Sequence, residues 1–83
     1  MAMPRLRLLG RKDCHLCEVA RLDLDSIGAP YELIDIDTEP KLVSLYDNAV
    51  PVLLDSDREL LRAPMSRRDI EEAISRLKGG VRG

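Results

Sequence analysis

The chain contains two cysteines, Cys14 and Cys17, which are separated by two residues and follow an extended apolar run at residues 6–9. If a strand leads through a short loop into a helix that begins at this pair, unpaired N–H groups of the helix lie beside the first cysteine. The positive end of the helix dipole there favours a thiolate over a thiol, and the thiolate is the nucleophile in disulfide exchange. The spacing therefore predicts a reactive dithiol, with Cys14 exposed at the loop–helix junction and Cys17 one turn into the helix.

Three other interpretations of the cysteine pair are available. A bridge between Cys14 and Cys17 closes too short a loop to stabilise the fold by restricting the unfolded chain. Two inert core residues remain an open alternative. As metal ligands, the cysteines and His15 supply at most three donors, and the sequence has no second Cys/His pair to complete a zinc site. We therefore expect no bound metal.

Length and composition limit the possible classes of protein. The chain has 83 residues, of which 45% are hydrophobic, and it contains neither Trp nor Phe. This size predicts a single domain over residues 1–83, with an ordered core at about residues 5–78, and we expect a monomer. The formal net charge is −2, which does not indicate nucleic-acid binding, and the acidic middle of the chain is interpreted as a solvated surface.

The same features predict the cellular compartment. The longest apolar run, residues 49–54, is much shorter than the roughly 18 residues of a membrane span. The first residues contain no apolar stretch of signal-peptide length. Two cysteines without a secretory leader favour a reducing compartment. We therefore expect a soluble, cytoplasmic protein with no membrane contact.

The first half of the chain predicts a strand, a helix and a second strand. Residues 5–9 are expected to form a strand that ends at Gly10, and residues 14–27 a helix that ends at Gly28. Residues 31–37 predict a second strand, which runs parallel to the first because the helix is a crossover connection. The buried face of this helix is expected to contain Cys17, Ala20, Leu24 and Ile27.

The next segment predicts a short helix and a hairpin. Thr38 is expected to cap the helix, with Pro40 in its first turn. Residues 50–54 and 59–62 predict two strands around a turn at residues 55–58. The buried side of the short helix is expected to contain Leu42, Val43, Leu45 and Tyr46.

The last element is expected to be a helix. Ser66 and Asp69 resemble a capping box that begins it. Gly79 and Gly80 are expected to end it, and residues 81–83 to fray. Its buried stripe is expected to contain Ile70, Ala73, Ile74 and Leu77.

The resulting order is β-α-β-α-β-β-α, with Cys-x-x-Cys at the start of the first helix and Val50-Pro51 at the start of the third strand. This combination resembles the thioredoxin fold and, over residues 5–78, the glutaredoxin-like proteins within it. The residues that carry the resemblance are 11–17, Tyr46, 50–52 and the last helix after the hairpin. It implies an α/β fold with a four-stranded mixed sheet and helices on both faces. It also implies the strand order second, first, third, fourth, with the last two strands antiparallel to the first two.

The resemblance implies a thiol–disulfide oxidoreductase that acts in cell redox homeostasis. Cys14 would attack a disulfide to form a mixed disulfide, and Cys17 would then resolve it. In the family, the proline at the position of Pro51 is cis and lies beside the cysteines. The backbone of the preceding residue, here Val50, would pair with an extended thiol substrate. His15 either tunes the thiolate of Cys14 or points to solvent.

Several charged residues near the motif are candidates for substrate binding. In glutaredoxins, a lysine at the position of Arg11 meets a carboxylate of glutathione, and Lys12 adds a second positive charge here. Ser66 begins a helix whose N-terminus can hold a carboxylate, and Arg67 is expected to flank the site. The stretch 62–68 lacks the Gly-Gly pair and the acidic residue usual in glutathione-binding relatives.

These resemblances define the expected partners. The substrate would be a protein or low-molecular-weight disulfide, with glutathione as a possible co-substrate and no tightly bound cofactor. Glutathione or a thioredoxin-type reductase would regenerate the dithiol. The alternative is a non-catalytic thioredoxin-like module for binding or redox sensing, in which the surface near Pro51 docks a partner chain.

Overall fold

The computed structural model describes residues 5–80, with side chains described up to residue 77. The elements follow the predicted order. They are β1 (Leu6–Gly10), α1 (His15–Ile27), β2 (Tyr31–Asp35), the 3-10 turn η1 (Ile36–Thr38), α2 (Pro40–Tyr46), β3 (Val52–Asp55), β4 (Arg58–Arg62) and α3 (Arg67–Gly80). The α/β fold with one mixed sheet is therefore confirmed.

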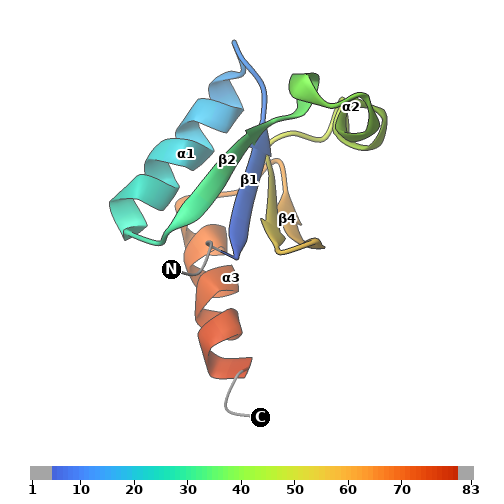
Figure 1. Ribbon diagram of the computed structural model, residues 1–83. Coiled ribbons are helices and arrows are strands. Elements are labelled where there is room, and N and C mark those ends of the chain that lie inside the picture. Colours follow the sequence, from blue (N-terminus) through green and yellow to red (C-terminus); the bar gives the residue numbers. More distant parts are fainter. Residues whose placement is uncertain (1–4, 81–83) are drawn as a thin grey trace.

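The four strands form one sheet in the order β2-β1-β3-β4, as predicted. β1 and β2 are parallel, β3 is antiparallel to β1, and β4 is antiparallel to β3. The expectation that both last strands oppose the first two was wrong for β4, because the hairpin turn reverses the chain once more. Helices α1 and α3 cover one face of the sheet, and α2 lies on the other side (Figure 1).

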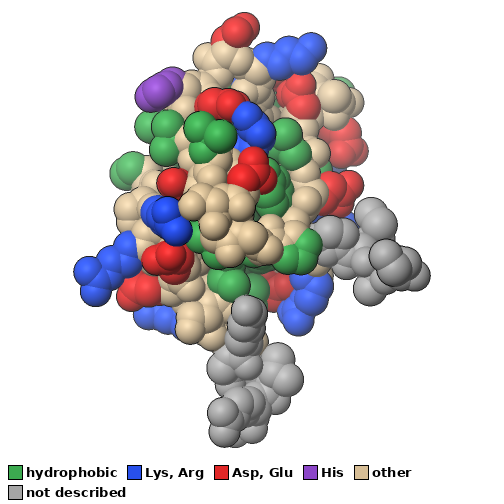
Figure 2. Space-filling view, turned by 90° about the vertical axis from the view of Figure 1, so that its left-hand side faces the viewer, with side chains coloured by type: hydrophobic (Ala, Val, Ile, Leu, Met, Phe, Trp, Pro, Cys, Tyr) green, Lys and Arg blue, Asp and Glu red, His purple; other side chains and the backbone are tan. Residues whose placement is uncertain are grey.

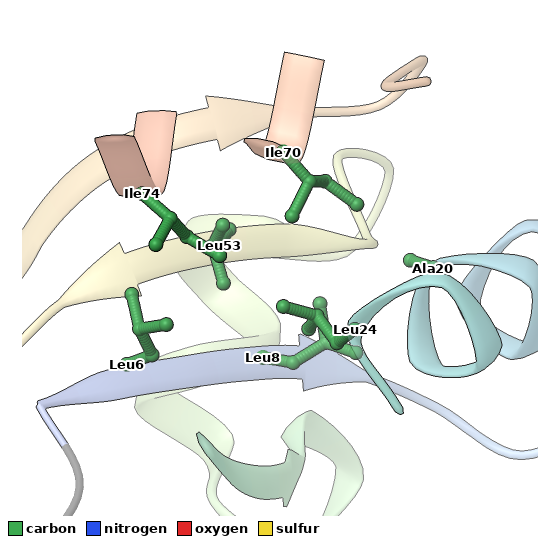
Figure 3. Packing of buried hydrophobic residues seen from close by; sticks show 7 residues of the cluster. All are labelled: Leu6, Leu8, Ala20, Leu24, Leu53, Ile70 and Ile74. Carbon is green, nitrogen blue, oxygen red and sulfur yellow. The ribbon is translucent and has the colours of Figure 1, made fainter. Parts of the chain in front are cut away.

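Side chains alternate between two hydrophobic cores because successive strand residues point to opposite faces. The larger core lies between the sheet and the helices α1 and α3 (Figure 3). Its buried residues are Leu6, Leu8, Ala20, Leu24, Leu53, Ile70 and Ile74. The smaller core lies under α2 and contains Leu9, Ile36, Val52 and Leu54. Both cores meet in β1, the strand that leads to the cysteines.

The region between β2 and α2 differs from the prediction. The strand ends at Asp35, because the Asp35 carboxylate accepts the N–H of Asp37 at 2.9 Å and starts the 3-10 turn. The Thr38 hydroxyl donates to the backbone oxygen of Asp35 at 2.7 Å. The prediction that Thr38 caps α2 was therefore wrong, and Glu39 occupies the N-cap without a side-chain hydrogen bond. The cap was misassigned because Thr38 closes the preceding turn instead.

The burial of α2 is also smaller than predicted. Leu42, Val43 and Tyr46 pack against the smaller core, but Leu45 is 59% exposed and its predicted burial was wrong. A helix of seven residues touches the sheet along only one narrow side, which excludes Leu45.

The ends of the two longer helices follow local capping rules. Gly28 adopts a φ of 84° and donates its N–H to the oxygen of Leu24 at 3.0 Å, so it caps α1 as predicted. The Ser66–Asp69 capping box of α3 is confirmed by reciprocal hydrogen bonds. The last residue of α3 is Gly80, in agreement with the prediction that Gly79 and Gly80 end this helix. Residues 81–83, which were expected to fray, lie outside the described residues.

Within residues 5–80, the structure contains no helix whose length and apolar character suit a membrane span. Helix α3 has 14 residues and α1 has 13.

Candidate active site

Cys14 occupies the N-cap of α1, where β1 ends in a short loop. Its backbone is extended, with φ −107° and ψ 107°, and its carbonyl accepts the N–H of Glu18 at 3.1 Å. Its sulfur accepts the backbone N–H of Cys17 at 3.2 Å. The sulfur therefore takes the position in which serine, threonine or aspartate oxygens usually cap a helix. A thiolate in this position is stabilised by the N–H donor and by the helix dipole.

The two cysteines are joined by a disulfide in the structure, with their Cα atoms 5.2 Å apart. Cys14 is half-buried, which is less exposure than the sequence predicted, whereas Cys17 is 7% exposed. An incoming sulfur atom therefore meets Cys14 first. Cys17 lies beneath it, on the face of α1 that packs against the sheet, which suits a resolving thiol.

Gly10 lies directly behind Cys17, at the end of β1. A Cβ atom at Gly10 would lie 3.3 Å from the Cβ of Cys17 and 3.4 Å from its Sγ. The distance to Cβ is tighter than ordinary van der Waals contact and the distance to Sγ is at its limit, so a side chain here would require Cys17 to shift by a few tenths of an ångström. Gly10 therefore positions Cys17.

Gly10→Ala is expected to slow the attack of Cys17 on a mixed disulfide at Cys14 by about three- to tenfold, because nucleophilic attack is sensitive to sub-ångström displacement. The measurement is the rate at which thionitrobenzoate is released from a mixed disulfide preformed on Cys14. Gly28→Ala is the matched control. It strains a left-handed residue at the far end of α1 and should lower stability without changing this rate. Equal rates in Gly10→Ala and the unmodified protein would show that Gly10 has no positioning role.

Pro51 and the cysteine loop lie at the same end of the two central strands, β1 and β3. The register pairs Val52 with Leu9, so Pro51 lies opposite the end of β1. Pro51 is buried, and the Val50–Pro51 peptide bond is cis. The carbonyl of Pro51 accepts the N–H of Ala63 at 2.9 Å. A second cis bond, Ala63–Pro64, was not predicted.

Arg11 is held by two acidic residues of its own chain. It donates to both carboxylate oxygens of Asp37, at 2.6 and 3.2 Å. It also donates to the carboxylate of Asp47 at 2.7 Å and to its backbone oxygen at 2.9 Å. These bonds connect the cysteine loop to η1 and to the end of α2, and we call the three residues the Arg11 cluster. Hydrogen bonding to Arg11 lowers the pKa of the Asp37 carboxyl below its ordinary value, and the same bond raises the pKa of Arg11.

The structure brings some of the predicted site residues together. A surface depression of about 700 Å³ lies between the cysteine loop, α1 and the edge of β2. The predicted residues that line it are Arg11, Lys12, Cys14, His15 and Cys17. The others do not line it, namely Val50, Pro51, Ser66 and Arg67. Each substrate-binding role assigned from the sequence stays a prediction.

The remaining predicted residues have simple environments. Lys12 and His15 are exposed. The Nε of Arg67 lies 3.5 Å from a carboxylate oxygen of Glu71. Ser66 forms the capping box of α3 with Asp69. Sequence reasoning missed Asp37, which belongs to the acidic middle interpreted as a solvated surface, and Asp47, for which no role in the site was predicted. Among the side chains that the structure describes, no group of three or more His, Cys, Asp or Glu could hold a metal ion.

Figure 2 faces the outer side of α1 and shows how this surface is composed. The single histidine lies near the upper rim, with hydrophobic side chains directly below it. Acidic and basic side chains are mixed over the rest of the face. No single sign of charge dominates this face.

Comparison with known proteins places the chain in a family. The model of the Glutaredoxin-like domain family (DUF836) matches residues 5–75, and the chain belongs to this family. The fold and the Cys14–Cys17 pair together support a function of the thiol–disulfide oxidoreductase type. A comparison with curated proteins finds no significant match.

Solved structures agree with this assignment. The chain is similar to protein XcR50 from X. campestris, with 35% identity and a TM-score of 0.76 over 84% of this chain and 95% of the other. It is also similar to protein Ne2328 from Nitrosomonas europaea, with 31% identity and a TM-score of 0.68 over 87% and 92%. The glutaredoxin (grx-1) from Archaeoglobus fulgidus shares the fold at 23% identity, with a TM-score of 0.65 and 88% of each chain covered.

Proposed function

We propose that this protein reduces disulfides, with Cys14 as the nucleophile and Cys17 as the resolving thiol. The observation that carries the proposal is the position of the Cys14 sulfur, which caps α1 and accepts the N–H of Cys17 at 3.2 Å. A sulfur atom that only filled space in the core would not be expected at a helix N-cap, where an oxygen usually accepts the backbone N–H. The half-buried outer thiol and the buried inner thiol give the two steps their order.

The reaction exchanges one disulfide for another. The Cys14 thiolate attacks one sulfur of the substrate, the substrate S–S bond breaks, and the first substrate thiolate leaves. The Cys17 thiol then loses its proton to solvent and attacks the Cys14 sulfur. The mixed disulfide breaks, and the second substrate thiolate leaves and is protonated. The substrate gains two electrons, and the protein is left with the Cys14–Cys17 disulfide seen in the structure.

Other parts of the site support substrate alignment. Val50 precedes the buried cis proline, at the end of the strands where the cysteine loop follows β1. Its backbone is the group proposed to pair with an extended substrate. An external dithiol, glutathione or a thioredoxin-type reductase would then return the protein to its reduced form in the cytoplasm. No tightly bound cofactor takes part.

Disulfide reduction by the purified protein tests this function. With dithiothreitol as electron donor, we expect the protein to accelerate insulin reduction well above the rate with dithiothreitol alone. In the reduced protein, iodoacetamide at mildly acidic pH should modify Cys14 before Cys17, which mass spectrometry of peptides identifies. An unaccelerated insulin reaction together with slow, equal alkylation of both cysteines would instead favour a non-catalytic binding or sensing module.

A further inference from the structure

Resting on the proposed function, we propose that the disulfide substrate is part of a polypeptide chain and that the site discriminates against glutathione. The reason is that the two positions that the sequence predicts to hold a substrate carboxylate are occupied by acidic residues of the protein itself, and one of them, Arg11, lines the depression beside the cysteines. These positions are the guanidinium of Arg11 and the N-terminus of α3.

The chemistry of the two substrate classes differs. Glutathione is a tripeptide with two carboxylates and one ammonium group, so a site that selects it must supply ionic contacts to those groups. A polypeptide disulfide instead offers backbone hydrogen bonds and neighbouring side chains over an extended segment. The charges around the cysteines therefore distinguish the two classes.

The first carboxylate position is closed at the Arg11 cluster. The guanidinium donates to Asp37 and Asp47 through four hydrogen bonds of 2.6–3.2 Å. One positive charge between two carboxylates leaves the cluster with a negative charge in excess. An incoming carboxylate would have to displace one of these partners and would be repelled by the other. The Arg11 cluster therefore repels the anion that a lone arginine would attract.

The second carboxylate position is closed at the N-terminus of α3. The Asp69 carboxylate accepts the N–H of Ser66 at 2.9 Å, and the Ser66 hydroxyl accepts the N–H of Asp69 at 3.0 Å. Hydrogen bonds from Ser66 hold the pKa of Asp69 below its ordinary value, so the carboxylate stays charged at neutral pH. The adjacent Arg67 lies 3.5 Å from Glu71. A negative charge already occupies the end of the helix that would receive a substrate carboxylate.

The exposed apolar side chains that follow Cys14 suit a polypeptide substrate better than glutathione. Leu16 and Val19 are 53% and 38% exposed and lie three residues apart on α1, immediately after Cys14. Apolar side chains that flank a substrate cysteine can contact them. Lys12 is exposed, and its charge acts on Asp37 of the Arg11 cluster, but one exposed lysine is screened by salt and contributes little binding.

Single-turnover kinetics test the inference without a regenerating enzyme. Fully reduced protein is mixed with excess insulin or oxidised glutathione and quenched with N-ethylmaleimide, and mass spectrometry counts the unreacted thiols. Each rate constant is divided by that of dithiothreitol with the same disulfide, which corrects for intrinsic reactivity. We expect the corrected rate constant for insulin to exceed that for oxidised glutathione by about tenfold or more, the ratio that one lost ionic contact produces.

Variants then test the cause of the discrimination. Asp37→Asn with Asp47→Asn releases the charge of Arg11, and Asp69→Asn removes the charge at α3 while its amide oxygen can still cap the helix. Each should raise the rate constant for oxidised glutathione about three- to tenfold and that for insulin much less. Asp57→Asn is the matched control. The side chain of Asp57 is 98% exposed in the β3–β4 turn, which lies at the end of the strands opposite to the cysteine loop. Circular dichroism verifies that each variant is folded.

Each outcome has one meaning. Preference for insulin, together with a gain for oxidised glutathione in both charge variants but not in Asp57→Asn, supports the inference. Equal corrected rates for the two disulfides in the unmodified protein overturn it and leave the proposed function intact. If the charge variants raise the rate constant for oxidised glutathione no more than Asp57→Asn does, the closed carboxylate positions do not set specificity. If neither disulfide oxidises the protein, the proposed function fails and the inference falls with it.

Discussion

Replacing Cys14 by serine is expected to reduce the rate of disulfide exchange by at least about a thousandfold, because the hydroxyl cannot replace the thiolate as nucleophile. The fold should survive, since serine is itself a preferred N-cap residue and can accept the N–H of Cys17 in place of the sulfur. The loss is therefore chemical and not structural. The measurement is the reduction of insulin disulfides with dithiothreitol, together with a thermal unfolding curve.

Cys17→Ser provides the matched comparison, because the substitution is the same and lies three residues away. Cys14 keeps its position, and the backbone N–H that it accepts is unaffected by the side-chain change. The first step should proceed at close to its normal rate, and the mixed disulfide should then accumulate because no resolving thiol is present. Mass spectrometry would show the added mass of the partner on Cys14. If Cys14→Ser instead trapped a partner on Cys17, the roles of the two thiols would be reversed.

The features that the sequence predicted correctly depend on local signals. The spacing of Ala20 and Leu24 predicts the buried face of α1, and both residues are at most 1% exposed. Gly28 ends the same helix because its φ of 84° is costly for other residues. The position of Cys14 at the N-cap follows from the strand and the helix on either side of it. Each of these inferences uses residues within a few positions of one another.

The parts that were missed depend on contacts between distant segments. Arg11 meets Asp37 and Asp47 across separations of 26 and 36 residues, so no local pattern identifies the three residues as one cluster. In the sequence, Arg11 has the position of a substrate ligand. In the folded chain, the same guanidinium holds the turn before α2 and the end of α2. The role of Arg11 in the site therefore depends on its two acidic partners and cannot be read from its residue type alone.

Leu24→Ala is expected to lower the free energy of unfolding by about 3 kcal/mol, through lost burial and an unfilled cavity. Leu24 is fully buried and packs with Leu8 and Leu53 on the face of the sheet that α1 covers (Figure 3). A domain of this size has a total stability of about 4–12 kcal/mol, so the loss is a large fraction of the whole. Denaturant unfolding is followed by far-ultraviolet circular dichroism, because the chain has no tryptophan.

Leu22→Ala is the matched control for this core substitution. It makes the same change in the same helix, but Leu22 is 54% exposed, so the expected loss is within about 0.5 kcal/mol. Leu24 follows Cys17 by two helical turns and fixes α1 against β1, the strand from which the cysteine loop departs. In the folded protein at low temperature, both variants should still form the mixed disulfide at Cys14, since neither side chain touches the sulfur atoms. Equal destabilisation by the two substitutions would mean that α1 is not anchored against β1 through Leu24.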